Sequence, residues 1–344
     1  MHKLRIQNSK LKIAITGGGT GGHLKVAKAI KDELNKRDIK PIFIGSTSGQ
    51  DKKWFENDEG FSAKYFLDSK GVVNQKGIKK INSLTNIIKL SFEANKILKK
   101  HNIKKVFSVG GFSAAPASFG AIMSKKELFI HEQNAHIGSL NKLLKPFSKR
   151  FFNTFFYNDP YPVEEIFFQG RIRKKIKTII FLGGSQGASA INNLAMDLAP
   201  FLKEKNINII HQTGKRDYLK IKDFYEKNNI KADFFDFDTN LIEKIKKADL
   251  AISRAGASTL FELVANNLPA VYIPYPYAAG DHQYYNAKFL EDKKASFVFR
   301  QNQIKKEIIF DILNLDLEEY SKNLNKLAVK NGAEYIVDEM LKEI

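Results

Sequence analysis

Gly17-Gly18-Gly19-Thr20-Gly21-Gly22-His23 lies between an apolar run at residues 11–16 and a segment, residues 24–36, whose apolar residues recur at helical spacing. These patterns predict a buried strand, a glycine-rich turn and a helix, in that order. Glycines let a ligand approach the backbone closely, and the unpaired N–H groups of a first helical turn attract anions. The stretch therefore indicates a phosphate site. The alternative is a tight turn without a ligand, which does not require His23.

Alternating strand and helix patterns continue through the whole chain. Apolar strand segments are predicted at 41–44, 62–66, 105–109, 128–131 and 150–153 in the first half, and at 178–182, 207–211, 232–235, 250–253 and 270–273 in the second. Helical segments are predicted at 51–57, 84–100, 188–202, 240–248, 259–267 and 281–290, with a mostly helical tail from 304. The alternation predicts an α/β protein with two doubly wound halves, joined by a linker at 158–173. Ligands of such folds bind at the carboxyl ends of the strands, so we expect one cleft between the halves.

The composition fits a folded protein of two domains and excludes several kinds of site. Of 344 residues, 43% are hydrophobic and 27% are charged, which is typical of globular chains. The absence of cysteine excludes disulfides and thiolate metal sites. We see no signal peptide and no apolar run long enough to cross a membrane, so we expect a cytoplasmic protein. The net charge of +19 favours an anionic membrane surface or anionic substrates over nucleic acid, with a lysine-biased composition as the alternative.

Three groups of residues in the second half follow predicted strands. Ser185 and Gln186 lie on a glycine loop whose backbone N–H groups can hold a diphosphate. Gly256 and Ala257 begin a helix directly after a strand, which makes a second anion site. Glu262 lies one turn into that helix, where a carboxylate can accept hydrogen bonds from two ribose hydroxyls. The alternative for Glu262 is a solvated helix residue.

Amide side chains mark two further candidate contacts. Gln283 and Asn286 are three residues apart and share one helix face, so they can hydrogen-bond the hydroxyls of a sugar. The alternative is a capped surface helix. In the first half, His131-Glu132-Gln133-Asn134 follows a buried strand, and Asn134 is the expected ligand contact. The histidine and glutamate that open this stretch are either site residues or a structural pair.

Asp236-Phe237-Asp238 has the Asp-x-Asp form of a metal site found in another nucleotide-sugar transferase architecture. It lies within the strand–helix series, where Asp238 or Asn240 more simply caps the following helix. No set of His, Asp and Glu has metal-ligand spacing, and the sequence contains no nucleophile elbow or Walker motif. We therefore expect neither a metal nor a cofactor.

Five short motifs occur in order along nearly the whole chain, namely residues 18–23, residues 131–134, Gly183-Gly184-Ser185-Gln186-Gly187, Arg254-x-Gly256-Ala257 with Glu262, and Gln283-x-x-Asn286. Together they resemble the MurG family, the N-acetylglucosaminyltransferases that act on undecaprenyl-diphosphoryl-MurNAc-pentapeptide. The resemblance implies a GT-B fold with two Rossmann-like domains, at 1–160 and 161–332, and a last helix at 333–344 that crosses back onto the first. It also implies inverting transfer of GlcNAc from UDP-GlcNAc to the 4-hydroxyl of the lipid-linked MurNAc (lipid I), which gives the disaccharide precursor of peptidoglycan.

The resemblance also implies a role for each motif. In the first domain, the residues that would meet the transferred sugar and the acceptor are Thr20, Gly21, Gly22 and Asn134. In the second, the loop of Ser185 and Gln186 and the helix start at Gly256 and Ala257 would lie at the UDP-GlcNAc diphosphate, with Glu262 on the ribose and Gln283 and Asn286 on the sugar. His23 is the expected general base, or alternatively a structural residue or a cation for the acceptor diphosphate. Phe112 stands where the family often has a tyrosine, and the linker lacks the family's arginine.

The lipid-linked acceptor stays in the bilayer, so the resemblance implies a peripheral enzyme on the cytoplasmic face of the inner membrane. Residues 71–100 combine basic and apolar side chains, namely Lys76, Lys79, Lys80, Lys89, Ile78, Ile81, Leu84, Ile87 and Ile88. Such a surface suits an anionic leaflet, and the alternative is an amphipathic helix that faces the core. The alternative functions are another GT-B UDP-sugar enzyme (a lipid glycosyltransferase or a UDP-GlcNAc epimerase) and a non-catalytic nucleotide- or nucleic-acid-binding protein.

Overall fold

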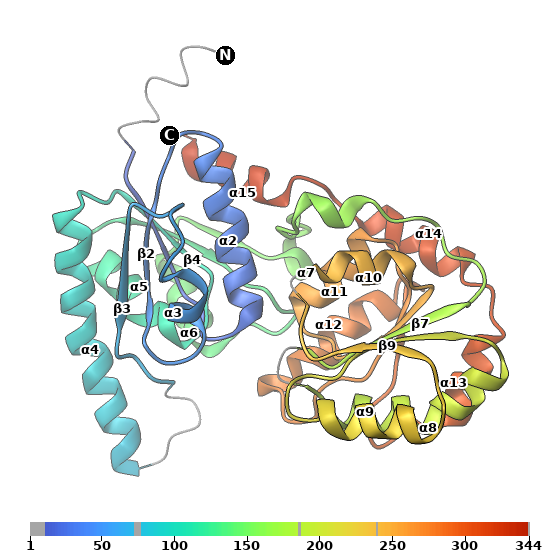
Figure 1. Cartoon of the computed structure of the whole chain (residues 1–344). Coiled ribbons are helices and arrows are strands. Elements are labelled where there is room, and N and C mark those ends of the chain that lie inside the picture. Colours follow the sequence, from blue (N-terminus) through green and yellow to red (C-terminus); the bar gives the residue numbers. More distant parts are fainter. Residues whose placement is uncertain (1–10, 72–76, 185–186, 239, 343–344) are drawn as a thin grey trace. The chain divides into compact units, whose positions relative to one another are not determined.

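The computed structural model describes residues 11–71, 77–184, 187–238 and 240–342 (Figure 1). The chain divides into two compact units, one formed by residues 1–163 and 331–344 and the other by residues 164–330. We call them the N-unit and the C-unit and describe each by itself. Each contains one six-stranded sheet in which all neighbouring strands are parallel.

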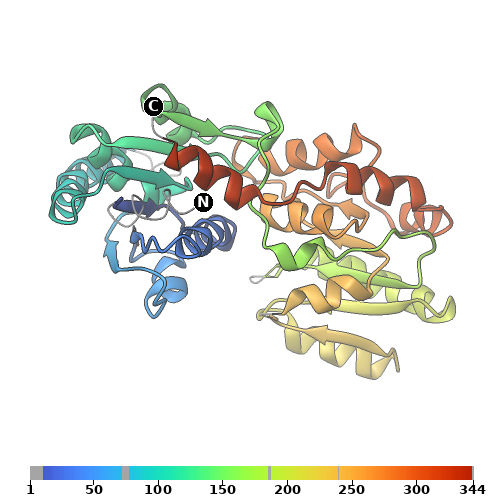
Figure 2. The same ribbon diagram turned by 90° about the horizontal axis from the view of Figure 1, so that it is seen from above.

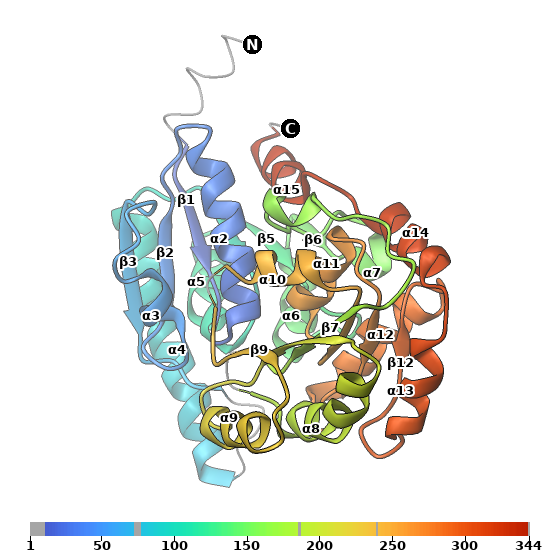
Figure 3. The same cartoon turned by 45° about the vertical axis from the view of Figure 1, so that its right-hand side comes forward.

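The N-unit sheet has the strand order β3-β2-β1-β4-β5-β6. Its strands are β1 (Ile13–Thr16), β2 (Ile42–Ser46), β3 (Ala63–Leu67), β4 (Lys105–Ser108), β5 (Glu127–His131) and β6 (Arg150–Phe152). Its helices are α2 (Gly21–Asn35), α3 (Asp51–Phe55), α4 (Gly77–Lys100), α5 (Ala115–Met123), α6 (Ser139–Leu144), α7 (Thr154–Tyr157) and α15 (Gly332–Leu341). Figure 3 shows β1, β2 and β3 side by side in this sheet.

Alternation of side chains along the strands builds two hydrophobic layers on the N-unit sheet. One face buries Ala14, Ile44 and Val106 against the helices α4 and α5. Parallel sheets covered on both faces need strands that are apolar throughout, and β1 is buried at every position. This requirement explains why the strand segments can be recognised in the sequence.

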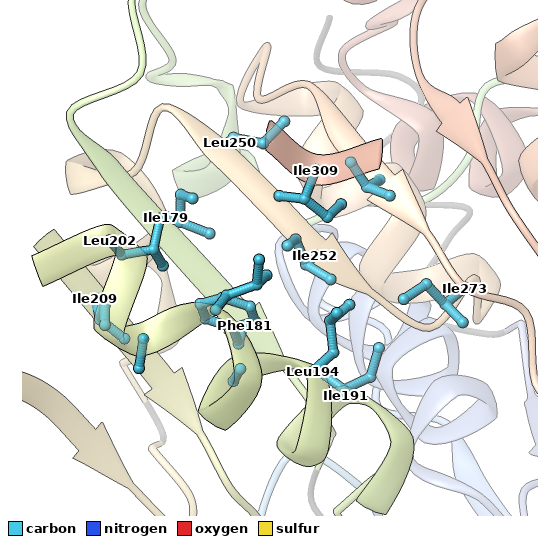
Figure 4. Close-up of a cluster of buried hydrophobic side chains, with 14 of the residues drawn as sticks. Ile179, Phe181, Ile191, Leu194, Leu202, Ile209, Leu250, Ile252, Ile273 and Ile309 are labelled. Atoms are coloured by element: carbon cyan, nitrogen blue, oxygen red, sulfur yellow. The ribbon is translucent and has the colours of Figure 1, made fainter. Parts of the chain in front are cut away.

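The C-unit repeats this architecture with the strand order β12-β11-β10-β7-β8-β9. Its strands are β7 (Thr178–Leu182), β8 (Asn208–Gln212), β9 (Ala232–Phe235), β10 (Leu250–Ser253), β11 (Ala270–Tyr272) and β12 (Phe297–Val298). Its helices are α8 (Ser189–Glu204), α9 (Tyr218–Lys227), α10 (Leu241–Lys247), α11 (Ala257–Ala265), α12 (His282–Glu291), α13 (Lys306–Leu313) and α14 (Glu318–Leu327). Figure 4 shows its core, in which Ile191 and Leu194 of α8 point toward Phe181 and Ile252 of the sheet.

The predicted doubly wound α/β fold is confirmed, and every predicted strand is present. The sequence patterns do not reveal α5, because this helix is buried around most of its circumference and lacks an amphipathic period. They also miss α9 and the two-residue strand β12. Helix α4 begins at Gly77, seven residues before the predicted start at 84.

Helix α15 returns to the N-unit at the end of the chain (Figure 2). It packs against α2, and Ile336, Val337 and Met340 are buried. Polar contacts add to this packing, because Arg37 pairs with Asp338 at 2.5 Å and Lys105 Nζ donates to the Met340 carbonyl at 2.6 Å. The last helix is therefore an integral part of the N-unit core.

A fully buried arginine ties the C-unit together. The guanidinium of Arg173 donates to the carbonyl of Arg171 at 2.7 Å, to Oδ1 of Asn266 at 2.6 Å, and to the carbonyl of Asn266. It also donates to the carbonyl of Ala248, just beyond the end of α10. Burial lowers the pKa of Arg173 to about 10, which still leaves the side chain charged at neutral pH. The arginine thus satisfies carbonyl groups near the ends of two helices.

Replacing Arg173 with lysine is expected to lower the free energy of unfolding of the C-unit by about 3 kcal/mol, because each buried carbonyl left unsatisfied costs roughly 1–3 kcal/mol. The matched control is Arg171→Lys, since Arg171 is half exposed and pairs with Asp249. Its expected effect is below about 1 kcal/mol. Hydrogen exchange of the β7 and β10 amides measures both effects, and equal losses in the two variants would contradict this account.

Candidate active site

Two glycine loops meet at the carboxyl edge of the N-unit sheet. The first loop begins at Gly17 and the second at Gly110. The strand order reverses between the neighbours β1 and β4, and a glycine loop follows each of these strands. The Gly18 N–H donates to the Gly110 carbonyl at 3.1 Å, and a Cβ on Gly111 would lie 2.2 Å from the Gly18 carbonyl oxygen. Gly111 also has a φ of 78°, a conformation that side chains rarely adopt. The second glycine loop therefore leaves room for the first one, at the point where doubly wound folds bind ligands.

The first loop opens helix α2 and holds four of the predicted site residues together. Helix α2 begins at Gly21, and its N-cap residue Thr20 makes no capping hydrogen bond from its side chain. The Thr20 hydroxyl instead shares a 2.9 Å hydrogen bond with Nδ1 of His23. Gly21, Gly22 and His23 are half-buried and Thr20 is exposed. The first turn of α2 is therefore partly accessible to solvent, and the His23 ring beside it is oriented by Thr20.

A buried carboxylate that the sequence analysis missed lies against this loop. Asp51 Oδ1 accepts from the Gly19 N–H at 2.5 Å, and Oδ2 accepts from the Ser46 N–H at 2.9 Å. Burial raises the pKa of Asp51, and the backbone N–H donors partly offset that rise. In the sequence, Asp51 is only the first residue of a predicted short helix, which gives no sign of this contact.

The stretch 131–134 is organised by Glu132. Its carboxylate accepts from the backbone N–H of Asn134 at 3.0 Å, from that of Gly138 at 2.9 Å and from Nδ2 of Asn141 at 2.9 Å. The half-buried Asn134 also donates from its own Nδ2 to Glu132 at 3.3 Å. The oxygens of Glu132 therefore hold the loop that carries Asn134, and these hydrogen bonds are made to residues other than His131.

His131 is buried directly behind the accessible loop. Its ring packs edge-on against Tyr161, with centroids 5.4 Å apart, and its Nδ1 has no hydrogen-bond partner among the described residues. Burial, with a smaller effect of the nearby His23, lowers the pKa of His131 to about 3. His131 is therefore neutral at neutral pH, whereas the half-buried His23 is the imidazole that a ligand can reach.

The C-unit has the same arrangement at the corresponding edge. Strands β7 and β10 are neighbours. The glycine loop that begins at Gly183 follows β7, and the turn at residues 254–256 follows β10. A Cβ built on Gly184 or Gly256 meets nothing within 4 Å, so both backbones border open space. Gly256 is the N-cap of α11 and Ala257 its first residue. The predicted contacts Ser185 and Gln186 lie outside the described residues.

Glu262 is buried in α11, with 4% of its surface exposed. The alternative that made it a solvated helix residue is therefore wrong. Burying a carboxylate costs free energy unless polar partners compensate. The position of Glu262 therefore indicates a structural or ligand-binding role. The ribose contact stays a prediction.

Gln283 and Asn286 of α12 both hold the turn that follows β10. Gln283 Oε1 accepts from the N–H groups of Ala255 at 3.3 Å and Tyr275 at 3.0 Å. Asn286 is fully buried and donates from Nδ2 to the Ala255 carbonyl at 3.1 Å. The alternative of a merely capped surface helix is wrong, because these amides position the turn before α11. The amide nitrogen of the half-buried Gln283 remains as a donor for a sugar hydroxyl.

Arg254 is a further residue at this edge to which the sequence analysis gave no role. Its guanidinium donates to the carbonyl groups of Ile273 at 2.9 Å and Pro274 at 3.0 Å, and to Gln301 Oε1 at 2.7 Å. Burial lowers its pKa. Arg254 thus connects the turn after β10 with the loop after β11.

No group of His, Asp and Glu that could hold a metal ion occurs in the described part of the chain. Within the Asp-x-Asp stretch, Asp238 accepts from the Asn240 N–H at 2.7 Å, which shapes the turn before α10. Asn240 is the N-cap residue of α10 and makes no capping bond from its side chain, so the predicted cap from Asn240 is wrong. Among the helices that the structure describes, none is long and apolar enough to cross a membrane.

Two family models match the chain, the glycosyltransferase family 28 N-terminal domain over residues 13–153 and the C-terminal domain over residues 178–340. The chain is 56% identical over 334 residues to a UDP-N-acetylglucosamine–N-acetylmuramyl-(pentapeptide) pyrophosphoryl-undecaprenol N-acetylglucosamine transferase from Campylobacter jejuni (strain RM1221), across 96% of this chain and 98% of that protein. A protein of the same name from a Nitratiruptor species is 54% identical over 336 residues, across 97% and 99%.

Among solved structures, the crystal structure of MurG from Acinetobacter baumannii matches with a TM-score of 0.78 and 27% identity, over 97% of this chain and 99% of that chain. The Streptomyces sp. SF2575 glycosyltransferase SsfS6, solved with thymidine diphosphate, matches with a TM-score of 0.64 over 96% and 100% of the two chains. Its 10% identity shows a shared fold alone.

Acidification is expected to destabilise the N-unit through His131. The buried ring has a pKa of about 3 when folded and about 6.5 when unfolded, so its contribution to stability is complete above pH 6.5 and declines as the pH falls toward 3. Between pH 6.5 and 5 this residue accounts for a loss of about 2 kcal/mol, at about 1.4 kcal/mol per pH unit. His131→Gln removes that part of the pH dependence.

Urea unfolding at several pH values measures this loss through the fluorescence of Trp54, the single tryptophan of the chain, which lies in the N-unit. The control is His136→Gln, because the exposed His136 meets water in both states. An unchanged pH dependence in His131→Gln would contradict the assignment.

Proposed function

Since this chain belongs to the MurG family within glycosyltransferase family 28, we propose how its two units divide the reaction. The enzyme transfers N-acetylglucosamine from UDP-N-acetylglucosamine to undecaprenyl-diphosphoryl-MurNAc-pentapeptide, converting lipid I to lipid II. The observation that carries this function is the 56% identity, over 96% of the chain, to a transferase of that name. The function sets aside an epimerase, another lipid glycosyltransferase and a non-catalytic binding protein as alternatives.

We assign the donor to the C-unit. The open backbone at Gly184 and Gly256 and the amino-terminal turn of α11 suit a diphosphate, because main-chain N–H groups and the helix dipole favour negative charge. Glu262 is assigned to the ribose hydroxyls and Gln283 to the sugar. Asn286 supports them by holding the turn at Ala255.

We assign the acceptor to the N-unit. The first turn of α2, at Thr20, Gly21 and Gly22, carries no side-chain cap from Thr20 and no acidic residue, so it suits the acceptor diphosphate. Asn134, held by Glu132, faces the reacting sugars in this assignment. The four residues are contributed by the loops after β1 and β5.

The proposed chemistry is a direct displacement with inversion. The 4-hydroxyl oxygen of MurNAc attacks C1 of GlcNAc, and the bond from C1 to the UDP oxygen breaks. His23 accepts the hydroxyl proton, since Thr20 orients its ring by bonding Nδ1 and the unperturbed pKa of an imidazole suits a base near neutral pH. Helix amino termini stabilise the charge that develops on the leaving diphosphate. The second role for His23 is that of a cation on the acceptor diphosphate.

Transfer of radiolabelled GlcNAc from UDP-GlcNAc to a lipid-linked MurNAc-peptide tests the function and the role of His23 together. His23→Ala is expected to lower kcat at least about 100-fold, because general-base catalysis contributes roughly 10²–10⁴-fold. Its Kd for UDP-GlcNAc, measured by calorimetry, should not change, because the donor is assigned to the C-unit. A higher acceptor KM with normal kcat would instead favour the cationic role, and near-normal turnover would remove His23 from the chemistry.

We further propose that α4 docks the enzyme on the cytoplasmic side of an anionic membrane. Ile81 and Ile88 are 61% and 59% exposed, and Leu84 and Phe92 on the same helical face are about half exposed. The core-facing alternative applies only to the second half of α4, where Leu90 to Leu98 contribute to the core. The described lysine of this surface, Lys89, is exposed, whereas Lys76 and the side chains of Ile78, Lys79 and Lys80 lie outside the described structure.

Replacing Ile81 and Ile88 together with serine is expected to weaken binding to anionic lipid vesicles at least tenfold, since burial of each isoleucine is worth roughly 1.5–3 kcal/mol. Sedimentation with vesicles of increasing phosphatidylglycerol content measures the effect. The matched control is Leu219→Ser, which removes an apolar side chain that is 72% exposed in the C-unit. Binding that ignores both the substitutions and the anionic lipid content counts against this surface.

A further inference from the structure

We infer that Asp51 is a positioning residue for the acceptor side of the reaction, holding the loop at Gly17–His23 in the form that aims the first turn of α2 at the acceptor diphosphate. The inference rests on the proposed function, which places the acceptor at that turn. Asp51 does not itself touch a substrate in this account, because its side chain is fully buried. It acts through the backbone of Gly19.

The carboxylate bridges two elements that are far apart in sequence. One oxygen accepts from the Gly19 N–H at 2.5 Å, and the other accepts from the Ser46 N–H at the end of β2 at 2.9 Å. A single side chain thus fixes the distance between the first glycine loop and the β2 edge. Both oxygens are used as acceptors from N–H groups, a demand that a carboxylate meets and an amide does not.

The packing around Asp51 shows that the loop rests directly on the carboxylate. A Cβ on Gly18 would lie 2.5 Å from Oδ1 of Asp51, and a Cβ on Gly45 would lie 3.0 Å from Oδ2. The turn before α3 closes the same space, because a Cβ on Gly49 would lie 2.9 Å from Cα of Gly19. Any displacement of the carboxylate is therefore transmitted to Gly18 and Gly19.

Helix α3 is itself anchored, so Asp51 has a fixed position from which to act. Phe55, one turn after Asp51, is buried and packs edge-on against Phe43 of β2 with ring centroids 4.7 Å apart. At the other end of the contact, the first glycine loop also rests on the second, since the Gly18 N–H donates to the Gly110 carbonyl at 3.1 Å. The N-cap residue Thr20 makes no side-chain cap on α2, and the hydrogen bond from Gly19 to Asp51 fixes the backbone one residue before that N-cap.

Asp51 is buried without an ion pair to any described Lys or Arg. Its carboxylate is held by neutral donors, among them the N–H groups of Gly19 and Ser46, and no Lys or Arg in the described part of the chain affects its pKa. Burial of an unpaired carboxylate is costly, and a merely structural turn can be held by a neutral side chain. A carboxylate can hold both N–H groups at once, one with each oxygen, and charge-assisted hydrogen bonds are stronger than neutral ones.

The test compares Asp51→Asn and Asp51→Glu with the wild-type enzyme in the GlcNAc-transfer assay, with KM measured separately for the lipid-linked acceptor and for UDP-GlcNAc. Asp51→Asn places an amide N–H opposite one of the two backbone donors, and we expect the acceptor KM to rise at least tenfold. The KM for UDP-GlcNAc should stay within twofold, because the donor is assigned to the C-unit. Asp51→Glu keeps two acceptor oxygens and should restore part of the acceptor affinity.

Asp58→Asn is the matched control. Asp58 is a mostly buried carboxylate of the same unit that pairs with Lys31 at 2.6 Å, away from the glycine loop. It should lower the unfolding midpoint without changing the acceptor KM. Trp54 lies on α3, with its ring 3.7 Å from a Cβ position on Gly21, so its fluorescence verifies that each variant is folded and that α3 still contacts the loop.

The outcomes distinguish a failure of the inference about Asp51 from a failure of the proposed function. A wild-type enzyme that transfers GlcNAc, together with a folded Asp51→Asn variant whose acceptor KM is unchanged, overturns the inference alone. Equal rises in both KM values also overturn it, since they indicate general damage. If Asp51→Asn does not fold, a folded Asp51→Glu variant with wild-type KM for both substrates has the same consequence. A wild-type enzyme that transfers nothing overturns the proposed function and the inference with it.

Discussion

The close approach of two glycine loops in the N-unit is the constraint on which the candidate site depends. The Gly18 N–H donates to the Gly110 carbonyl, and the Gly18 carbonyl lies so close to Gly111 that a Cβ on Gly111 has no room. The loops can meet only because β1 and β4 are parallel neighbours whose carboxyl ends lie at one edge. The strand order brings the two loops to one edge, and the glycines allow their backbones to touch there. The site needs both.

The C-unit solves the same problem with different side chains. Its neighbours β7 and β10 again bring a glycine loop and a helix start to one edge. Here the turn after β10 is held by amides, since Gln283 and Asn286 both bond to the backbone of Ala255. In the N-unit the corresponding work is done by carboxylates, at Asp51 and Glu132. Main-chain groups thus provide the accessible surface in both units, and buried polar side chains fix where that surface lies.

Several predicted site residues are buried, and their hydrogen bonds are made within the protein. Glu132 and Asn286 stand in motifs that suggest ligand contacts, yet Glu132 binds the backbone and side chains of its own loop and Asn286 donates to the Ala255 carbonyl. His23 and His131 differ in the same way, because one is accessible and the other is buried and neutral. A polar residue at the end of a strand therefore either contacts a ligand or holds the backbone of the site in place. Only the surroundings of the side chain show which of these two roles it has.

The two doubly wound sheets can be predicted from the sequence, because strands covered on both faces must be apolar and their alternation with helices is visible in the chain. The sequence also located the glycine loops and motif residues such as His23, Glu262 and Gln283. It did not reveal α5, which lacks an amphipathic period, nor the role of Asp51, which is set by Gly19 and by the end of β2. Contacts between distant parts of the chain determine which polar side chains support the backbone, because hydrogen bonds between residues far apart in sequence produce no periodic pattern.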